Sequence, residues 1–195
     1  MREYTLFETA IGHCGIAWDG ETIVGVQLPE ARVADTRAKV QDRFDGVEVG
    51  DPPPGVQHAI DEMVASLRGE PNDLEGIVLD LETVPPFHRR VYEVVRTIPS
   101  GETLSYGEVA MEVGSPGAAR AVGQALGRNP FAIIVPCHRV LASGGKTGGF
   151  TANGGVSTKL RMLAIEGIRP LPERGACAAV PRKQLAEYGK SWVIT

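Results

Sequence analysis

The stretch Phe131-Ala-Ile-Ile-Val-Pro-Cys-His-Arg-Val140 sets five consecutive apolar residues just before the side chains that can carry chemistry. A short apolar run bounded by turn signals is typical of a buried strand, and Asn129-Pro130 supplies the signal in front of it. The sequence therefore predicts a buried strand over Phe131–Val135. Such a strand would deliver Cys137 and His138 to the end of a core element.

Cys137 stands apart from Cys14 and Cys177 because a histidine follows it. A thiol reacts as its thiolate, which a neighbouring base helps to form. Side chains of adjacent residues on an extended segment point apart, so the chain has to turn before His138 can act on Cys137. A buried cysteine beside a surface histidine is the simpler interpretation of this pair alone.

The other two cysteines carry no comparable signal. Cys14 lies in an apolar run, where a small buried side chain is expected, and Cys177 lies in a tail rich in Gly, Ala and Pro. Three scattered cysteines make a poor disulfide framework, and no CxxC pair offers a zinc site. We therefore expect neither a metal nor a cofactor.

Glu166 strengthens the interpretation of Cys137 as a nucleophile. It ends a predicted helix over Ser157–Glu166, on the side of Met162 and Leu163 that packs inward. A carboxylate on an apolar face needs a partner, and a histidine is a natural one. Cys137, His138 and Glu166 would then be nucleophile, base and orienting group.

Two short helices, Ser105–Val113 and Gly117–Gly127, are predicted on either side of Gly114-Ser-Pro116, a spacing typical of a helix-turn-helix. The second carries almost no long polar side chains; only Arg120 and Gln124 can reach outward. Small residues allow a close approach either to another helix or to the minor groove of DNA. Both interpretations stay open at this point.

The remaining pattern predicts an α+β fold with a small antiparallel meander first and a mostly helical second part. The predicted strands are Tyr4–Ala10, Gly15–Trp18, Thr22–Leu28 and Ile77–Leu81, and the predicted helices are Ala31–Phe44, Val56–Arg68 and Phe87–Ile98. Val84-Pro-Pro86 is the expected linker, which gives domains over 1–83 and 87–169 and a tail over 170–195, in which Pro181–Tyr188 can form a short helix.

The charge is divided unevenly. Residues 1–86 hold six basic and 17 acidic side chains, a net charge of −11, whereas residues 87–195 hold 14 and seven, a net charge of +7. A basic half beside an acidic one suggests that the second half meets a polyanion, although surface charge also varies without function. We expect the acidic half to face away from such a partner, and Arg120, Arg128, Arg139 and Lys146 to contact its phosphates.

The composition excludes a membrane-spanning protein. The apolar fraction of 43% and the charged fraction of 23% are ordinary for a globular domain. No apolar run approaches the ~20 residues needed to cross a bilayer. The first residues mix acidic and polar side chains among apolar ones, unlike a signal peptide. We therefore expect a cytoplasmic protein.

Beyond these local arguments, Pro136-Cys-His-Arg-Val140 resembles the active-site motif of the O6-alkylguanine-DNA alkyltransferases, also called methylated-DNA–protein-cysteine methyltransferases. The resemblance covers residues 87–168 strongly and 1–80 in outline. It extends over further motifs in the family's order: Phe87-x3-Val91-Tyr92, Ile98-Pro-x-Gly101, Ser105-Tyr106-x2-Val109-Ala110, Ala118-Ala-Arg-Ala-Val-Gly123, Asn129-Pro130 and Leu163-x2-Glu166-Gly167.

The resemblance implies a function and a set of catalytic roles. The protein would repair O6-alkylguanine, and O4-alkylthymine, by moving the alkyl group irreversibly onto Cys137 after flipping the base out of the duplex. His138 would deprotonate Cys137 through a water, with Glu166 orienting the histidine. Asn129 would tie the turn that holds the cysteine, and Tyr106 would help to rotate the nucleotide and protonate the departing guanine.

The resemblance also implies how DNA would be held. A monomer would bind double-stranded DNA through the minor groove, with Arg120 occupying the place of the extruded base. The expected DNA-binding residues are Ser105, Ala118, Ala119, Arg120, Gly123, Gln124 and Arg128, and the expected pocket residues are Val140, Phe150 and Thr151. The first domain would be ribonuclease-H-like.

Four features depart from the family pattern. The loop over Gly148–Gly155 is about two residues longer than the commonest version, Phe150 stands where tyrosine is frequent, and the tail beyond Pro170 has no counterpart. A zinc cluster that some members carry is also missing, since His13 and Cys14 are too few ligands.

Three other functions compete with alkyl transfer. A binding-only alkyltransferase-like protein would recognise damage without repairing it, but such proteins replace the cysteine that is present here as Cys137. A Cys-His-Glu hydrolase would need an oxyanion hole and a cleft for an ester or peptide. An alkyl-accepting sensor would usually carry additional domains.

Overall fold

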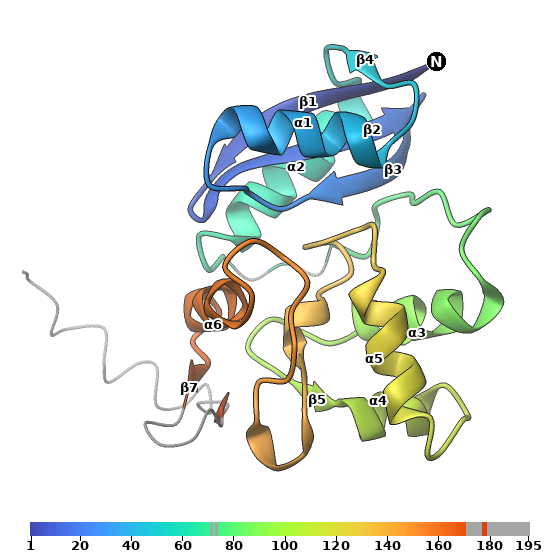
Figure 1. Cartoon of the computed structure of the whole chain (residues 1–195), viewed down its shortest axis with the longest axis vertical. Coiled ribbons are helices and arrows are strands. Elements are labelled where there is room, and N and C mark those ends of the chain that lie inside the picture. The colour runs from blue at the N-terminus through green and yellow to red at the C-terminus, as the bar shows by residue number, and fades with distance from the viewer. Residues whose placement is uncertain (71, 73, 171–176, 179–195) are drawn as a thin grey trace, which may run out of the picture.

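The computed structural model describes residues 1–70, 72, 74–170 and 177–178 of the chain. The described residues form a mixed α+β structure with a four-stranded sheet and six α-helices. Figure 1 shows the sheet with α1 and α2 at one end of the molecule and α3 to α6 at the other. The predicted α+β class is therefore confirmed.

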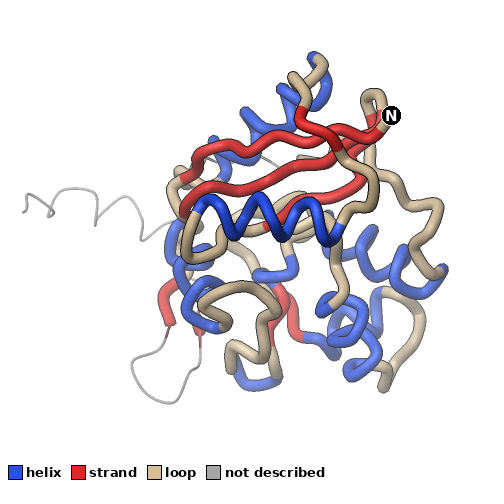
Figure 2. Tube along the Cα trace, turned by 45° about the horizontal axis from the view of Figure 1, so that its top comes forward, coloured by secondary structure: helices blue, strands red, loops and turns tan. Residues whose placement is uncertain are grey.

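The sheet contains the predicted meander of β1 (Arg2–Thr9), β2 (Gly12–Asp19) and β3 (Thr22–Gln27), paired antiparallel. A two-residue strand, β4 (Glu48–Val49), joins parallel to β1 and completes the order β3-β2-β1-β4. The central strand β2 is buried over five consecutive residues, Cys14–Trp18. Helices α1 (Val33–Arg43) and α2 (Pro54–Ser66) lie on opposite faces of the sheet and exclude water from both sides of that strand (Figures 1 and 2).

Proline decides where two helices begin. Helices α2 and α3 (Pro86–Arg96) both have proline at their first turn and another proline at the N-cap. Proline fits this position because its missing N–H would have no partner there and its φ is already helical. Both helices therefore begin one or two residues before their predicted starts at Val56 and Phe87, and α3 begins inside the predicted linker.

The second half of the described chain is mostly helical. It contains β5 (Leu104–Ser105), α4 (Tyr106–Glu112), α5 (Ala119–Gly127), a 3-10 turn over Cys137–Arg139, β6 (Val140–Leu141), a 3-10 turn over Ser143–Gly145, α6 (Val156–Ile165), β7 (Arg169–Pro170) and β8 (Cys177–Ala178). Strand β6 pairs parallel with β5, and β8 antiparallel with β7. The tail helix predicted over Pro181–Tyr188 lies outside the described residues.

One apolar core joins the two ends of the molecule. It contains residues of the sheet, of α2 and of the helical half, among them Ile16, Met63, Val91, Val122 and Phe131. No helix in the described ranges is long and apolar enough to span a membrane.

Two predicted strands are wrong. Around Leu79 the chain makes only one isolated parallel bridge to Ile23, fixed by two backbone hydrogen bonds on either side of it. The apolar run Phe131–Val135 pairs with the sheet only at Phe131, which bridges to Val26, and then turns. The run is buried as predicted, but it is a turn within the core.

Candidate active site

Asn129 explains why the apolar run turns. Its side-chain amide donates to the Val135 carbonyl at 2.9 Å, and its side-chain oxygen accepts from the Phe131 N–H at 2.9 Å. The Val135 N–H also donates to the Phe131 carbonyl at 2.8 Å, which closes the turn. These bonds replace the partners that a sheet would offer, and they hold Ile133 at φ 74°, a conformation that a β-branched residue adopts only under constraint.

Cys137 begins a 3-10 turn directly after this constrained segment. In such a turn neighbouring side chains do not alternate as they do on a strand, so the expected separation of Cys137 and His138 on opposite faces does not arise. Cys137 is half-buried and lines a cleft of about 980 Å³. Burial raises the pKa of its thiol, and a hydrogen bond from Asn129 and the charges of Lys159 and Arg43 partly oppose that rise.

A buried network fixes the histidine next to the thiol. His138 Nε2 lies 2.9 Å from Glu166 Oε1, and both side chains are less than 5% exposed. Arg139 meets the same carboxylate, with its Nη2 at 2.8 Å from Oε1 and its Nε at 3.1 Å from both oxygens. Its Nη1 donates to the Ile98 carbonyl at 2.6 Å, so the guanidinium is held between two segments.

The charge of this network determines the histidine tautomer. Burial alone would raise the pKa of Glu166, but the neighbouring His138 and Arg139 lower it to about 2. An ionised carboxylate only accepts hydrogen bonds, so Nε2 of His138 carries the proton that points at Glu166. In its neutral form the ring then has its lone pair on Nδ1, which is buried and has no hydrogen-bond partner among the described residues.

The thiol and the imidazole are not bonded directly. Within residues 1–70, 72, 74–170 and 177–178, no hydrogen bond links Cys137 Sγ to the His138 ring. A proton passing from the thiol to Nδ1 therefore needs a bridging group between them. The predicted contact between His138 and Glu166 is present in the structure. The water expected between Cys137 and His138 stays a prediction.

Arg139 was expected on the surface as a phosphate contact, and that expectation is wrong. The residue is 3% exposed and both ends of its guanidinium are occupied. The sequence shows only a basic residue in a polar motif, whereas its burial follows from the position of Glu166, 27 residues further along the chain.

Tyr106 stands at the first turn of α4 and lines the cleft. Burial raises the pKa of its hydroxyl. Lys159 Nζ lies 5.8 Å from the centre of its ring and donates to the Val140 carbonyl at 2.6 Å. A Cβ at Gly148 would come within 3.2 Å of the Tyr106 hydroxyl oxygen, and this glycine also has φ of +68°. Glycine at 148 therefore lets the loop pass close to the tyrosine.

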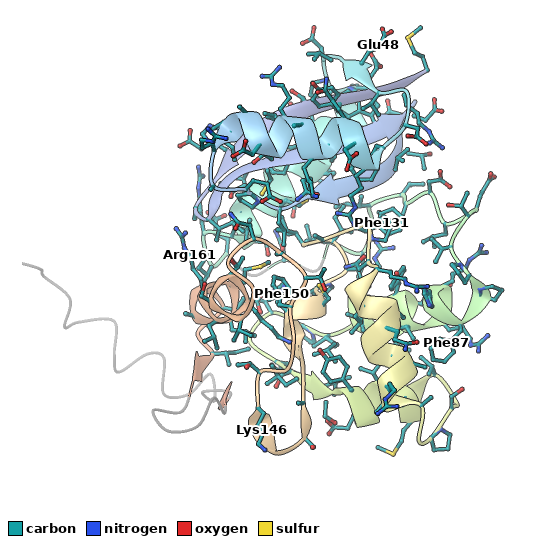
Figure 3. All side chains as sticks on the ribbon, in the orientation of Figure 1. Glu48, Phe87, Phe131, Lys146, Phe150 and Arg161 are labelled. Atoms are coloured by element: carbon teal, nitrogen blue, oxygen red, sulfur yellow. The ribbon has the colours of Figure 1, made fainter. Side chains whose placement is uncertain are left out.

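The predicted pocket residues separate into two groups. Phe150 and Thr151 line the cleft, on the loop that Figure 3 shows between α6 and α5. Val140 does not line the cleft. Its side chain is completely buried in β6, and its backbone carbonyl accepts a hydrogen bond from Lys159. The prediction that Val140 belongs to the pocket is therefore wrong, because the chain passes into the core directly after the 3-10 turn. Lys146 lies at the far end of the same loop, away from Phe150 (Figure 3).

Helix α5 turns its apolar side chains inward and its polar ones outward. Val122, Ala125 and Leu126 are buried against α3 and α4. Arg120 and Gln124 are exposed, and Gly123 and Arg128 line the cleft together with Arg120. Ala118 and Ala119 are half-buried at the start of the helix. Close packing on a neighbouring helix therefore explains only one face of α5.

Ser105 was expected to contact DNA, but its side chain already has a structural partner. Its hydroxyl oxygen accepts from the Glu108 N–H at 3.2 Å, while the Glu108 carboxylate accepts from the Ser105 N–H at 2.6 Å. This reciprocal pair is a capping box at the start of α4.

Sequence reasoning missed Arg43 and Lys159. Arg43, on α1, donates to the Asn129 carbonyl at 2.8 Å and to Gln27 at 3.2 Å, and it lines the cleft. Lys159 is fully buried on α6. Lys159 lies three residues before Met162 and four before Leu163, on the inward face that identified Glu166, so the same helical spacing could have found it.

A thiol on a constrained turn, a histidine held by a buried carboxylate and an exposed cleft beside a small-residue helix define a cysteine-dependent transferase or hydrolase. No group of His, Cys, Asp and Glu side chains in the described part of the chain could hold a metal ion. The comparisons with known proteins then select between these classes.

Residues 86–168 match the family model described as 6-O-methylguanine DNA methyltransferase, DNA binding domain. The chain is 38% identical over 167 residues to a methylated-DNA–protein-cysteine methyltransferase of Mycobacterium bovis, which covers 85% of this chain and 93% of the relative. It is 50% identical over 82 residues to the protein of that name from Shigella flexneri, covering 42% and 47% of the two chains.

Solved structures agree. The crystal structure of the Mycobacterium tuberculosis O6-methylguanine methyltransferase is 37% identical, with a TM-score of 0.68 and coverage of 85% of this chain and 93% of that one. The OGT of the same organism in complex with DNA gives 37% identity and a TM-score of 0.67, with coverage of 84% and 92%. The chain belongs to the methylated-DNA–protein-cysteine methyltransferase family.

Proposed function

We propose that this protein repairs O6-alkylguanine in DNA by transferring the alkyl group to Cys137, once per chain. The observation that carries the proposal is Cys137 in an open cleft beside His138, whose ring is fixed by the buried Glu166. The relatives are named for the same transfer to a protein cysteine, and one relative was solved with DNA. O4-alkylthymine, with an alkylated oxygen of the same kind, is the second expected substrate.

The chemical step follows from the tautomer of His138. Its Nδ1 takes the thiol proton through a water, because Nε2 is already bonded to Glu166. The thiolate sulfur attacks the alkyl carbon, an S–C bond forms, and the bond between that carbon and guanine O6 breaks with its electron pair leaving on the guanine. A proton returned to the base, for which Tyr106 is the donor in the cleft, restores guanine.

The resting thiol is protonated in this scheme, since burial raises the pKa of Cys137. The base is therefore required, and Arg43 and Lys159 contribute by stabilising the thiolate as it forms. No group that lines the cleft in the described part of the chain could reverse the transfer from the thioether product, which accounts for a single turnover.

The DNA has to present a base that normally lies inside the duplex. We propose that α4 and α5 act as a helix-turn-helix whose second helix enters the minor groove with its small residues, and that the exposed Arg120 fills the place of the extruded nucleotide. Ala118, Ala119, Gly123, Gln124 and Arg128 would line this contact. Phe150 and Thr151 would border the extruded base in the cleft.

The organisation proposed with this function is a monomer with a ribonuclease-H-like domain over 1–83, a catalytic domain over 87–169 and a tail over 170–195. No cofactor enters the scheme. Because the substrate is DNA, we place the protein inside the cell, in the cytoplasm.

Two competing functions predict different fates for Cys137 and for the lesion. A hydrolase would regenerate Cys137 and process many substrate molecules, whereas a binding-only protein would leave the lesion intact. Neither is favoured by the family to which the chain belongs.

The test is a titration of duplex DNA containing O6-methylguanine with increasing protein, followed by digestion and quantification of the modified base. We expect one lesion to disappear per chain, and none with Cys137→Ala, which should still bind the duplex. Lesion loss far beyond one per chain, or equal loss with Cys137→Ala, would overturn the proposal.

A further inference from the structure

The basic residues of the acidic half are not spread evenly. Of the six basic side chains in residues 1–86, four lie on α1 or at its N-cap: Arg32, Arg37, Lys39 and Arg43. Arg32 forms an ion pair with Asp35 at 2.8 Å, so its charge has a local partner. Lys39 and Arg43 are four residues apart, on one face of the helix.

That face borders the cleft of Cys137. Lys39 and Arg43 line it from α1, and Arg120 and Arg128 line it from the side of α5. Arg43 is positioned by its bonds to Asn129 and Gln27, whereas Lys39 is exposed and forms no ion pair within the described ranges. In Figure 1 α1 lies in front of the sheet, directly above α5 and the loop that carries Phe150.

A DNA duplex bound to α5 would also contact the face of α1 that carries Lys39 and Arg43. A helix in the minor groove, which is only about 6 Å wide, has a phosphate backbone along each of its sides. Among the described residues, four cations and a single carboxylate, Glu30, border the cleft. Its mouth is therefore attractive to a polyanion, although residues 1–86 carry a net charge of −11.

We propose that α1 forms part of the DNA-binding surface, with Lys39 contacting a phosphate of the strand that runs along the α1 side of the cleft. This inference rests on the proposed function, and it replaces the expectation that the acidic half as a whole faces away from DNA. Glu30, on the same rim, opposes the contact and tunes its strength.

The test compares Lys39→Gln with Arg37→Gln, a matched control two residues away on the same helix that is exposed and does not line the cleft. Affinity for undamaged duplex is measured by fluorescence anisotropy over a range of salt concentrations. Lys39→Gln should weaken binding two- to fivefold at low salt, an effect of about the size of one exposed ion pair. It should also reduce the salt slope by about 0.9, the value for one phosphate contact, while Arg37→Gln leaves both unchanged. Glu30→Gln should strengthen binding.

Reaction with free O6-benzylguanine distinguishes a loss of DNA binding from a loss of the chemical step. Lys39→Gln should react with this free base as fast as the unmodified protein, because only the duplex carries phosphates. If Lys39→Gln and Arg37→Gln bind alike, or if Lys39→Gln slows the free base as much as the duplex, the inference is wrong. Failure of the unmodified protein to transfer any methyl group would instead refute the proposed function itself.

Discussion

The surroundings of Cys14 and Cys137 show how one fold makes one thiol inert and another available. Cys14 lies on the central strand β2, has no exposed surface, and has Thr9 Oγ1 at 3.8 Å. Burial there raises its pKa to about 12, and the Thr9 hydrogen bond opposes the rise only slightly. Cys137 also has a raised pKa, but an amide and two cations counteract it, and the thiol borders an open cleft.

Burial of the sulfur is therefore not the property that distinguishes the two cysteines. The difference lies in what surrounds the thiolate once it forms. Among the described residues, only the Thr9 hydroxyl is hydrogen-bonded to Cys14. Beside Cys137, in contrast, Asn129, Lys159 and Arg43 favour the thiolate. In the proposed scheme, His138 accepts the thiol proton. Reactivity should then depend on the turn and its network, and each prediction below tests one part of that difference.

The largest effect is expected from the cysteines themselves. Cys137→Ala should abolish transfer from duplex containing O6-methylguanine, because no other cysteine borders the cleft among the described residues. Cys14→Ala should transfer at the normal rate and lose only about 1 kcal/mol of unfolding free energy, from the small cavity in the sheet core. Rapid-quench assays and denaturant titrations measure the two quantities; a slow Cys14→Ala that remains fully folded would contradict the comparison.

The next effect is that of Glu166. Glu166→Gln should slow transfer roughly 10²-fold, because an amide no longer fixes the His138 tautomer. It should also destabilise the fold by about 3 kcal/mol near neutral pH, since Arg139 is then buried without its counter-charge. Glu93→Gln, at an exposed carboxylate, is the matched control.

The stability loss in Glu166→Gln should depend on pH. The folded-state pKa of about 2 lies below the ordinary value of 4.5, so the carboxylate stabilises the fold above that ordinary value. This contribution fades as the pH falls from about 4.5 to about 2, and the difference between the variant and the unmodified protein should shrink over that interval. A difference that stays constant across the interval would show that the buried charge is not its source.

Replacing Arg120 should affect the rate of reaction with duplex DNA but not the rate with the free base. Arg120→Ala should slow repair in duplex about tenfold or more, because the extruded nucleotide is no longer replaced, and should leave the reaction with free O6-benzylguanine nearly unchanged. Gln124→Ala, on the same exposed face of α5, is the comparison variant and should have a smaller effect. Equal losses on both substrates for Arg120→Ala would count against a role in the duplex.

The smallest effect is expected from Tyr106→Phe. The ring keeps its packing against Gly148 and Lys159 and loses only the hydroxyl. Transfer from both substrates should slow by less than about tenfold, through loss of a proton donor. The two rates measured under single-turnover conditions check this; a loss restricted to the duplex would assign the hydroxyl to nucleotide rotation alone.

Local patterns were sufficient to predict much of the fold. The meander, the helices α1 to α6 and the inward position of Glu166 follow from periodicity and turn residues that lie close together in the sequence. Proline shifted two helix starts, and the rule for proline at the first turn could have placed them correctly.

The errors occurred where a distant partner decides the structure. The run Phe131–Val135 has the composition of a strand, but the side chain of Asn129 supplies its hydrogen bonds and turns it. Arg139 is buried because it forms an ion pair with Glu166. Val140 is buried in the core, where its carbonyl accepts a hydrogen bond from Lys159. The proposed role of α1 depends on a contact between Arg43 and Asn129, 86 residues apart, which no local pattern reveals.

The most direct measurement of the central claim is to locate the alkyl group after reaction with excess duplex containing O6-methylguanine. Intact-mass analysis followed by peptide mapping gives both the number of methyl groups and their positions. We predict a plateau at one methyl group per chain, located entirely on the peptide that contains Cys137, with the Cys14 and Cys177 peptides unmodified. Methylation of either of those cysteines, a second methyl group on the chain, or loss of the lesion while the protein stays unmodified would contradict the account.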